Sequence, residues 1–181
     1  RKESSAASDV YKRQSLFQPT KEGQMLAYKR VWKQSEAKPF LIEAHATGTH
    51  VGDLTESSSI EEFFRGNETH IGAVKGLFGH TKGNAGALSV LKGISIFEKN
   101  LIPGNTKVQN SRFQNSEFIV NERNATISSE LSTIGVSSFG FGGCNYHLNL
   151  DRFQESNEKL TEGNLKIHKA ALRVSVLKKN H

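Results

Sequence analysis

The chain has 181 residues, a formal net charge of +6 and one cysteine. This length fits about one domain, and no apolar run approaches the ~18 residues of a membrane-spanning helix. A single cysteine excludes a disulfide framework and a cysteine-rich zinc site. No charged segment leads into an apolar one as in a secretory signal, so we expect a cytoplasmic protein that does not contact a membrane.

The basic residues of the chain are in excess only at its two ends. Residues 1–38 carry nine basic and four acidic residues, residues 151–181 carry seven and four, and the middle carries eight and ten. Residues 1–14 resemble the translation of a sequencing-library adapter and are set aside, with a solvated basic arm as the alternative. We expect one domain over residues 15–150, followed by a linker or the start of another module over 151–181. The acidic middle disfavours a nucleic-acid partner.

Helices and strands alternate in the expected order of elements. Apolar spacing and turn residues predict helices over 21–36, 55–65 and 84–99, and strands over 40–42, 71–74, 118–120, 134–138 and 146–150. Thr20 is the expected N-cap of the first helix. The helix over 84–99 has apolar residues around most of its circumference, which predicts burial on more than one side. The pattern indicates an α/β fold with a sheet buried under helices.

Three polar, glycine-bearing segments follow or join expected strands. They are Glu43–Thr49 with the nearby Gly52–Glu56, then Val74–Thr81, and finally Ser137–His147. Loops at the ends of strands in α/β folds are frequent positions for binding and catalytic groups. The last segment is not a dinucleotide-binding loop, because Asn145 replaces the final glycine of that motif and no helix follows.

Together the three segments resemble the C-terminal half of a β-ketoacyl synthase, and the resemblance covers roughly residues 16–150. The first segment reads Glu-Ala-His-Ala-Thr-Gly-Thr, the second contains Val-Lys and Gly-His, and the third reads Ser-Ser-Phe-Gly-Phe-Gly-Gly-Cys-Asn-Tyr-His. The Gly-Asp-x-x-Glu sequence at Gly52–Glu56 is most similar to type I polyketide synthases. The resemblance implies a thiolase-like fold, of which this chain forms the C-terminal half of a layered αβαβα architecture.

The family's reaction is a decarboxylative Claisen condensation of a malonyl-type thioester with an acyl chain, so the resemblance implies an acyltransferase. Decarboxylation places negative charge on the thioester oxygen, which two imidazole N–H donors can stabilise. By resemblance His45 and His80 are these donors, and Lys75 orders the second histidine and holds charge near the malonyl carboxylate. We expect the two rings to reach one small group from adjacent strand-end loops. Any one of these side chains alone would be an ordinary structural residue.

The resemblance also assigns the substrate contacts. Thr47 and Thr49 match hydroxyls that bind the phosphopantetheine arm of an acyl carrier protein, and no cofactor is expected to bind directly. The backbone N–H of Phe141 contributes to an oxyanion hole and its ring gates the acyl pocket. Asp53 and Glu56 are expected to cap and start the following helix. Cys144 is expected to be a small buried residue, and Cys144 with His147 gives too few ligands for a metal site.

The family's nucleophilic cysteine belongs to the N-terminal half of the domain. We therefore expect the isolated chain to be inactive, and expect its partners to be that half, an acyl carrier protein and a second copy in a homodimer. The alternative is a non-catalytic ketosynthase-like partner, against which the retained His45, Lys75 and His80 argue. Among the departures from the family pattern, Ala46 and Gly76 replace a glycine and a serine. Chain length, starter unit and a polyketide or fatty-acid product are left open.

Overall fold

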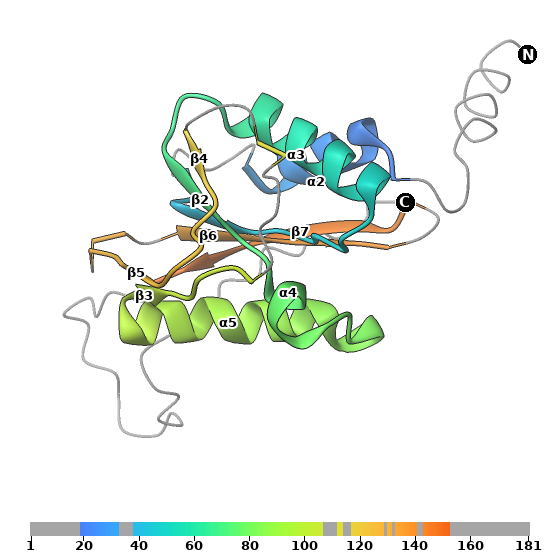
Figure 1. The fold of residues 1–181 in the computed structure, drawn as a ribbon. Helices are drawn as coiled ribbons and strands as arrows, with labels where there is room; N and C mark the ends of the chain where they lie inside the picture. Colours follow the sequence, from blue (N-terminus) through green and yellow to red (C-terminus); the bar gives the residue numbers. More distant parts are fainter. Residues whose placement is uncertain are drawn as a thin grey trace, which may run out of the picture.

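The structure is a computed structural model. It describes residues 19–32, 38–106, 112–113, 117–128, 130–131, 133–140 and 143–152. A five-stranded sheet in the order β4-β2-β1-β6-β7 forms its centre (Figure 1). The strands are β1 (Leu41–Glu43), β2 (Thr69–Gly72), β4 (Phe118–Ile119), β6 (Thr133–Phe139) and β7 (Asn145–Asp151). All neighbours are parallel except β6 and β7, which form the expected antiparallel hairpin.

Helices cover both faces of the sheet. α2 (Lys21–Trp32) and α3 (His50–Phe64) lie on one face, and α5 (Ala85–Lys99) lies on the other beside the short α4 (Val74–Phe78), as Figure 1 shows. The 3-10 turn η1 (Lys82–Asn84) leads into α5, and β3 (Leu101–Ile102) pairs with β5 (Ala125–Thr126) in a small ribbon. The observed α/β layering agrees with the sequence prediction. Among the described residues, no helix is both long and apolar enough to cross a bilayer.

Each face of the sheet has its own apolar core because side chains alternate along the strands. Ile42 and Phe139 pack under α2 and α3 with Tyr28 and Ile60. Leu41 and its neighbours face α5 instead, in a second cluster with Ile96, Phe97, Ile134 and Leu150. A Cβ at Gly93 would lie 2.6 Å from Leu150 Cδ1, so this glycine lets α5 approach the sheet closely.

Several expected boundaries are wrong. α3 begins at His50, five residues before the expected start. The second strand ends at Gly72 rather than at Val74, which instead begins the short helix α4. The first helix is described only to Trp32, although its expected N-cap contact is present, from the backbone N–H of Gly23 to Thr20 Oγ1 at 3.3 Å. The expected boundaries of the helix over 84–99 hold to within one residue, but only one face of α5 is buried and Leu91 is 59% exposed.

Candidate active site

The carboxyl ends of three neighbouring strands place the candidate residues together. β1 ends at Glu43 and leads to His45, β2 ends at Gly72 and leads through α4 to His80, and β6 ends at Phe139. Because β2, β1 and β6 are adjacent and parallel, these ends share one edge of the sheet. The ring centroids of His45 and His80 lie 5.9 Å apart, and the Phe139 ring lies 5.8 Å from that of His45. The two histidines are therefore neighbours, as the sequence predicted.

The backbone around His80 fixes which ring nitrogen carries its proton. The Nδ1 atom of His80 accepts a hydrogen bond from the backbone N–H of Lys82 at 3.0 Å. A neutral imidazole has one donor and one acceptor nitrogen, so His80 carries its proton on Nε2. Gly79, with φ 76°, turns the chain just before His80 in a conformation that disfavours side chains. The exposed ring of His80 thus presents an N–H donor.

His45 is held neutral by its surroundings. Burial, and after it the positive charge of Lys75, lower the pKa of His45 to about 4. Its Nδ1 atom is buried and has no hydrogen-bond partner among the described residues. At neutral pH the ring is therefore an uncharged imidazole with one N–H, which is the form that can donate to a developing oxyanion.

Glu56 holds the loop that carries His45. Its two carboxylate oxygens accept the backbone N–H groups of His45 at 2.7 Å and Ala46 at 2.8 Å. Burial raises the pKa of Glu56 to about 7, against the lowering effect of these two bonds and of Lys75. The expectation that Glu56 starts the helix is wrong, because α3 already begins at His50 and the carboxylate reaches back to the preceding loop. The sequence carries no local signal for this contact, which depends on the way α3 returns along the sheet.

The loop after His45 bends sharply and then enters α3. Ala46 has φ 36°, a left-handed conformation that favours glycine. Thr49 is the N-cap of α3 and accepts from the N–H of Gly52 at 3.2 Å, while the Thr47 and Thr49 hydroxyls are 3.2 Å apart. Asp53 lies in the first helical turn, as expected of an acid near a helix N-terminus, and also accepts from the N–H of Gly48 at 3.2 Å. The sequence missed the capping role of Thr49.

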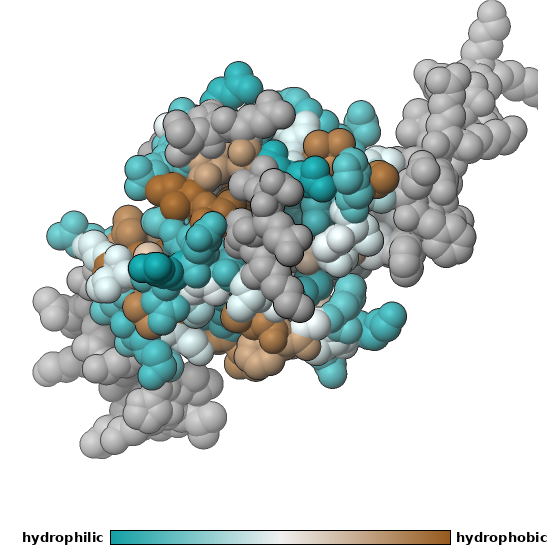
Figure 2. Space-filling view, viewed as in Figure 1, coloured by the Kyte–Doolittle hydropathy of each residue, from teal (hydrophilic) through white to brown (hydrophobic). Residues whose placement is uncertain are grey.

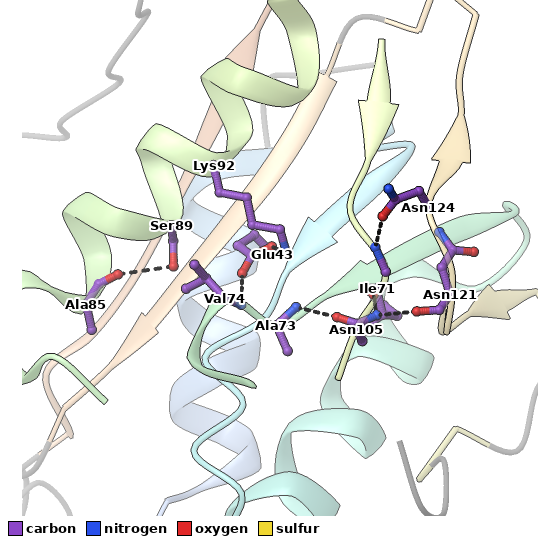
Figure 3. A network of polar contacts seen from close by, with 11 residues as sticks. Glu43, Ile71, Ala73, Val74, Ala85, Ser89, Lys92, Asn105, Asn121 and Asn124 are labelled. Carbon is purple, nitrogen blue, oxygen red and sulfur yellow. Dashed lines mark hydrogen bonds and ion pairs between the residues drawn. The ribbon is translucent and has the colours of Figure 1, made fainter. Parts of the chain in front are cut away.

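Lys75 lies in α4 with a side chain that is almost fully enclosed. Burial lowers the pKa of Lys75, whereas the nearby Glu56 and Glu43 raise it. Lys75 lies in the turn between the end of β2 and His80, and its charge lowers the pKa of His45. A second buried cation, Lys92 of α5, forms an ion pair with Glu43 at 2.7 Å (Figure 3).

The third segment is described in part. Phe141 lies outside the described residues. Cys144 is exposed, so its expected burial is wrong: the turn pairs the N–H of Gly140 with the Cys144 carbonyl at 2.9 Å and leaves the Cys144 side chain outside. His147 is buried, with Nε2 accepting from Trp32 Nε1 at 3.0 Å and Nδ1 lying 3.0 Å from Ser137 Oγ. Within the described part of the chain, no three metal-ligating side chains lie together in a way that could hold a metal ion. Cys144 and His147 are therefore not part of such a group.

A pocket opens behind the His45 loop rather than at the imidazoles. Apolar side chains line much of it, and Asp53, Glu56 and Arg112 are its charged residues. Neither histidine nor Lys75 borders it. We place the candidate site at the strand ends, where the His45 and His80 rings lie side by side.

Comparison with known proteins shows the family to which the chain is similar. A family model described as Beta-ketoacyl synthase, C-terminal domain, matches residues 2–109 and so includes most of the segment 1–14. Compactin diketide synthase of Penicillium citrinum is 32% identical over 70% of this chain, and a highly reducing polyketide synthase of Pyricularia oryzae is 34% identical over 75%. A component of the polyunsaturated fatty acid synthase of a Thraustochytrium species is 31% identical over 81%. The chain spans only 5%, 5% and 6% of these three relatives.

Solved structures show the same fold. The ketosynthase from module 1 of the bacillaene synthase of Bacillus amyloliquefaciens superposes with a TM-score of 0.70 at 25% identity, covering 77% of this chain and 27% of that one. Ketosynthase twelve of the bacillaene polyketide synthase of the same species gives 0.72 at 24% identity, covering 78% and 28%. Both matches cover little more than a quarter of the solved chain.

Proposed function

Because the chain belongs to the β-ketoacyl synthase family, with the thiolase-like fold and as a C-terminal piece of a ketosynthase domain, we propose that it supplies the decarboxylating part of a condensing site. The observation that carries this proposal is the convergence of His45 and His80, with ring centroids 5.9 Å apart at the shared edge of the sheet. The parent protein is then an acyltransferase that extends an acyl chain in polyketide or fatty-acid synthesis.

The reaction begins with a malonyl thioester carried on the phosphopantetheine arm of an acyl carrier protein. The bond between the carboxylate and the α-carbon breaks, carbon dioxide leaves, and the electron pair moves onto the thioester oxygen as an enolate. Two neutral N–H donors, one from His45 and one from His80 Nε2, stabilise that oxygen without a change in their own protonation. Preorganised donors of this kind contribute about 3 kcal/mol each to lowering the barrier.

The enolate carbon then attacks an acyl group bound as a thioester to a cysteine of the N-terminal half. A carbon–carbon bond forms, and the cysteine thiolate is released. In this scheme Lys75 supplies positive charge for the malonyl carboxylate, Thr47 and Thr49 contact the arm, and the N–H of Phe141 helps to form the acyl oxyanion hole. The neutral state of His45 and the Nε2 proton of His80 support the assignment of the two donors.

The N-terminal half is also the proposed cover for this chain's exposed apolar side chains. Phe78 on α4 is 67% exposed, Leu91 on α5 is 59% exposed and Tyr146 on β7 is 71% exposed. Figure 2 shows apolar patches on the surface, one of them over the lower layer that contains α4 and α5. We further propose that the parent protein is a cytoplasmic homodimer and that it binds neither nucleic acid nor a membrane.

The test compares the intact protein that carries these residues with the isolated 181-residue chain. We expect the intact protein to extend an acyl thioester with malonyl carrier protein, and the isolated chain to give no extended product. Mass spectrometry of the carrier protein detects the product. If the intact protein neither releases carbon dioxide nor accepts an acyl group, the alternative of a non-catalytic partner replaces the enzyme. Extension by the isolated chain contradicts the proposed need for a second half.

A further inference from the structure

The turn that carries Lys75 is held by side chains from a distant part of the sequence. α4 has five residues, Val74–Phe78, and its N-cap residue Ala73 makes no side-chain capping bond. A helix this short has little stability of its own, because most of its backbone groups lack intrahelical partners. The place of Lys75 in the site therefore depends on contacts from outside the helix.

Asn105 fastens the start of this turn (Figure 3). Its Oδ1 atom accepts the backbone N–H of Ala73 at 2.9 Å, and its Nδ2 atom donates to the carbonyls of Ile71 at 2.8 Å and Asn121 at 3.2 Å. Asn105 is 8% exposed, so these bonds are shielded from water. One amide side chain thus joins the end of β2 to the chain that follows β4.

Two more side chains hold the residues on either side of Lys75. The N–H of Val74 donates to Glu43 Oε1, and the Thr106 hydroxyl donates to the carbonyl of Gly76 at 2.6 Å. A Cβ at position 76 would lie 3.2 Å from Thr106 Oγ1, so glycine makes room for this hydroxyl. The backbone is therefore fixed by external side chains at residues 71, 73, 74 and 76, which bracket Lys75.

We propose that Asn105 and Thr106 are positioning residues that hold the α4 turn and thereby the position of Lys75 in the decarboxylation site. This inference rests on the proposed function. Neither side chain needs to touch substrate, since their bonds go to the backbone that carries Lys75. The step they support is carbon dioxide release, and acyl loading on the other half of the domain does not depend on them.

The test uses Thr106, because it is exposed and its replacement does not empty a buried position. Thr106→Val keeps the shape of the side chain but removes its hydroxyl, whereas Thr106→Ser keeps the hydroxyl. Thr126→Val, at an exposed threonine of β5, is the matched control. In the intact protein two rates are measured separately: carbon dioxide release from malonyl carrier protein, and transfer of an acyl group onto the enzyme.

We expect Thr106→Val to slow carbon dioxide release about fivefold, equivalent to one lost hydrogen bond, while acyl loading matches that of Thr126→Val. Thr106→Ser should recover most of the rate. Unchanged carbon dioxide release in Thr106→Val, or an equal fall in both rates, overturns the inference. A wild-type protein that loads acyl groups but releases no carbon dioxide instead contradicts the proposed function itself.

Discussion

The imidazole rings of His45 and His80 meet edge to face, with centroids 5.9 Å apart and planes inclined at 88°. The two residues are separated by 35 positions in the sequence but follow neighbouring parallel strands, β1 and β2. Both histidines lie in loops that are held by hydrogen bonds from other residues. Glu56 accepts the backbone N–H of His45, and the backbone N–H of Lys82 donates to the ring of His80. The pair is therefore preorganised by contacts from α3 and from the turn before α5.

His45 should remain uncharged well below neutral pH. Burial and the positive charge of Lys75 lower its pKa to about 4, so its ring should not become protonated between about pH 8 and pH 5.5. Histidine-labelled NMR of a ketosynthase domain that contains both halves measures this directly. A titration midpoint above about pH 6 for His45 would show that the surroundings of the ring are more polar than the structure indicates.

The ion pair between Glu43 and Lys92 should be essential for stability. Both side chains are buried and 2.7 Å apart, so Lys92→Met leaves a carboxylate without its cation in the interior. We expect a loss of about 3–5 kcal/mol in the free energy of unfolding. The matched control is Lys21→Met, which removes an exposed pair with Glu62 and should hardly move the urea midpoint. Equal effects of the two variants would refute the buried role of Glu43.

Ala46→Gly should stabilise the loop at His45. The residue has φ 36°, where a side chain is strained, and glycine relieves that strain at some cost in chain entropy. The expected net gain is about 0.5 kcal/mol in the free energy of unfolding. Ala27→Gly, in the middle of α2, should lose about 1 kcal/mol and serves as the control. Destabilisation by both substitutions would exclude strain at Ala46.

His147 should make stability fall in acid. Burial lowers its pKa to about 3, below the value of about 6.5 in an unfolded chain. Between these values the unfolded state binds more protons, so the contribution of His147 is complete above about pH 6.5 and is lost as the pH falls toward 3. His147→Asn, which has no imidazole to protonate, should show a shallower decline in chemical denaturation over this range. If the stability of the wild type and of His147→Asn declines equally with pH, a group other than His147 causes the acid destabilisation.

The sequence was most informative where the pattern was long and regular. Fifteen residues with helical spacing located α5, and alternating apolar residues located both β6 and β7 and their pairing. The helix over 50–64 was placed too late because its first turn, from His50, is polar and resembles a loop. Thr49 followed by an acid at Asp53 is a capping signal that could have corrected this start.

The contacts that shape the site were harder to foresee. Glu56, Asn105 and Thr106 act on backbone groups between 10 and 34 residues away in the sequence. No local periodicity encodes such bonds, since they arise only when strands and helices have packed. The exposure of Cys144 has the same origin, because its residue type favours burial while the tight turn at Gly140 directs it outward.

Carbon dioxide release from malonyl carrier protein by the intact protein tests the central claim most directly. If His45 and His80 are the two oxyanion donors, replacing either with alanine should lower the rate by about 10²- to 10³-fold and leave acyl loading intact. His50→Ala, at an exposed histidine of the adjacent helix, should keep the wild-type rate. Carbon dioxide release that survives in His45→Ala and His80→Ala at the level of His50→Ala would contradict the account.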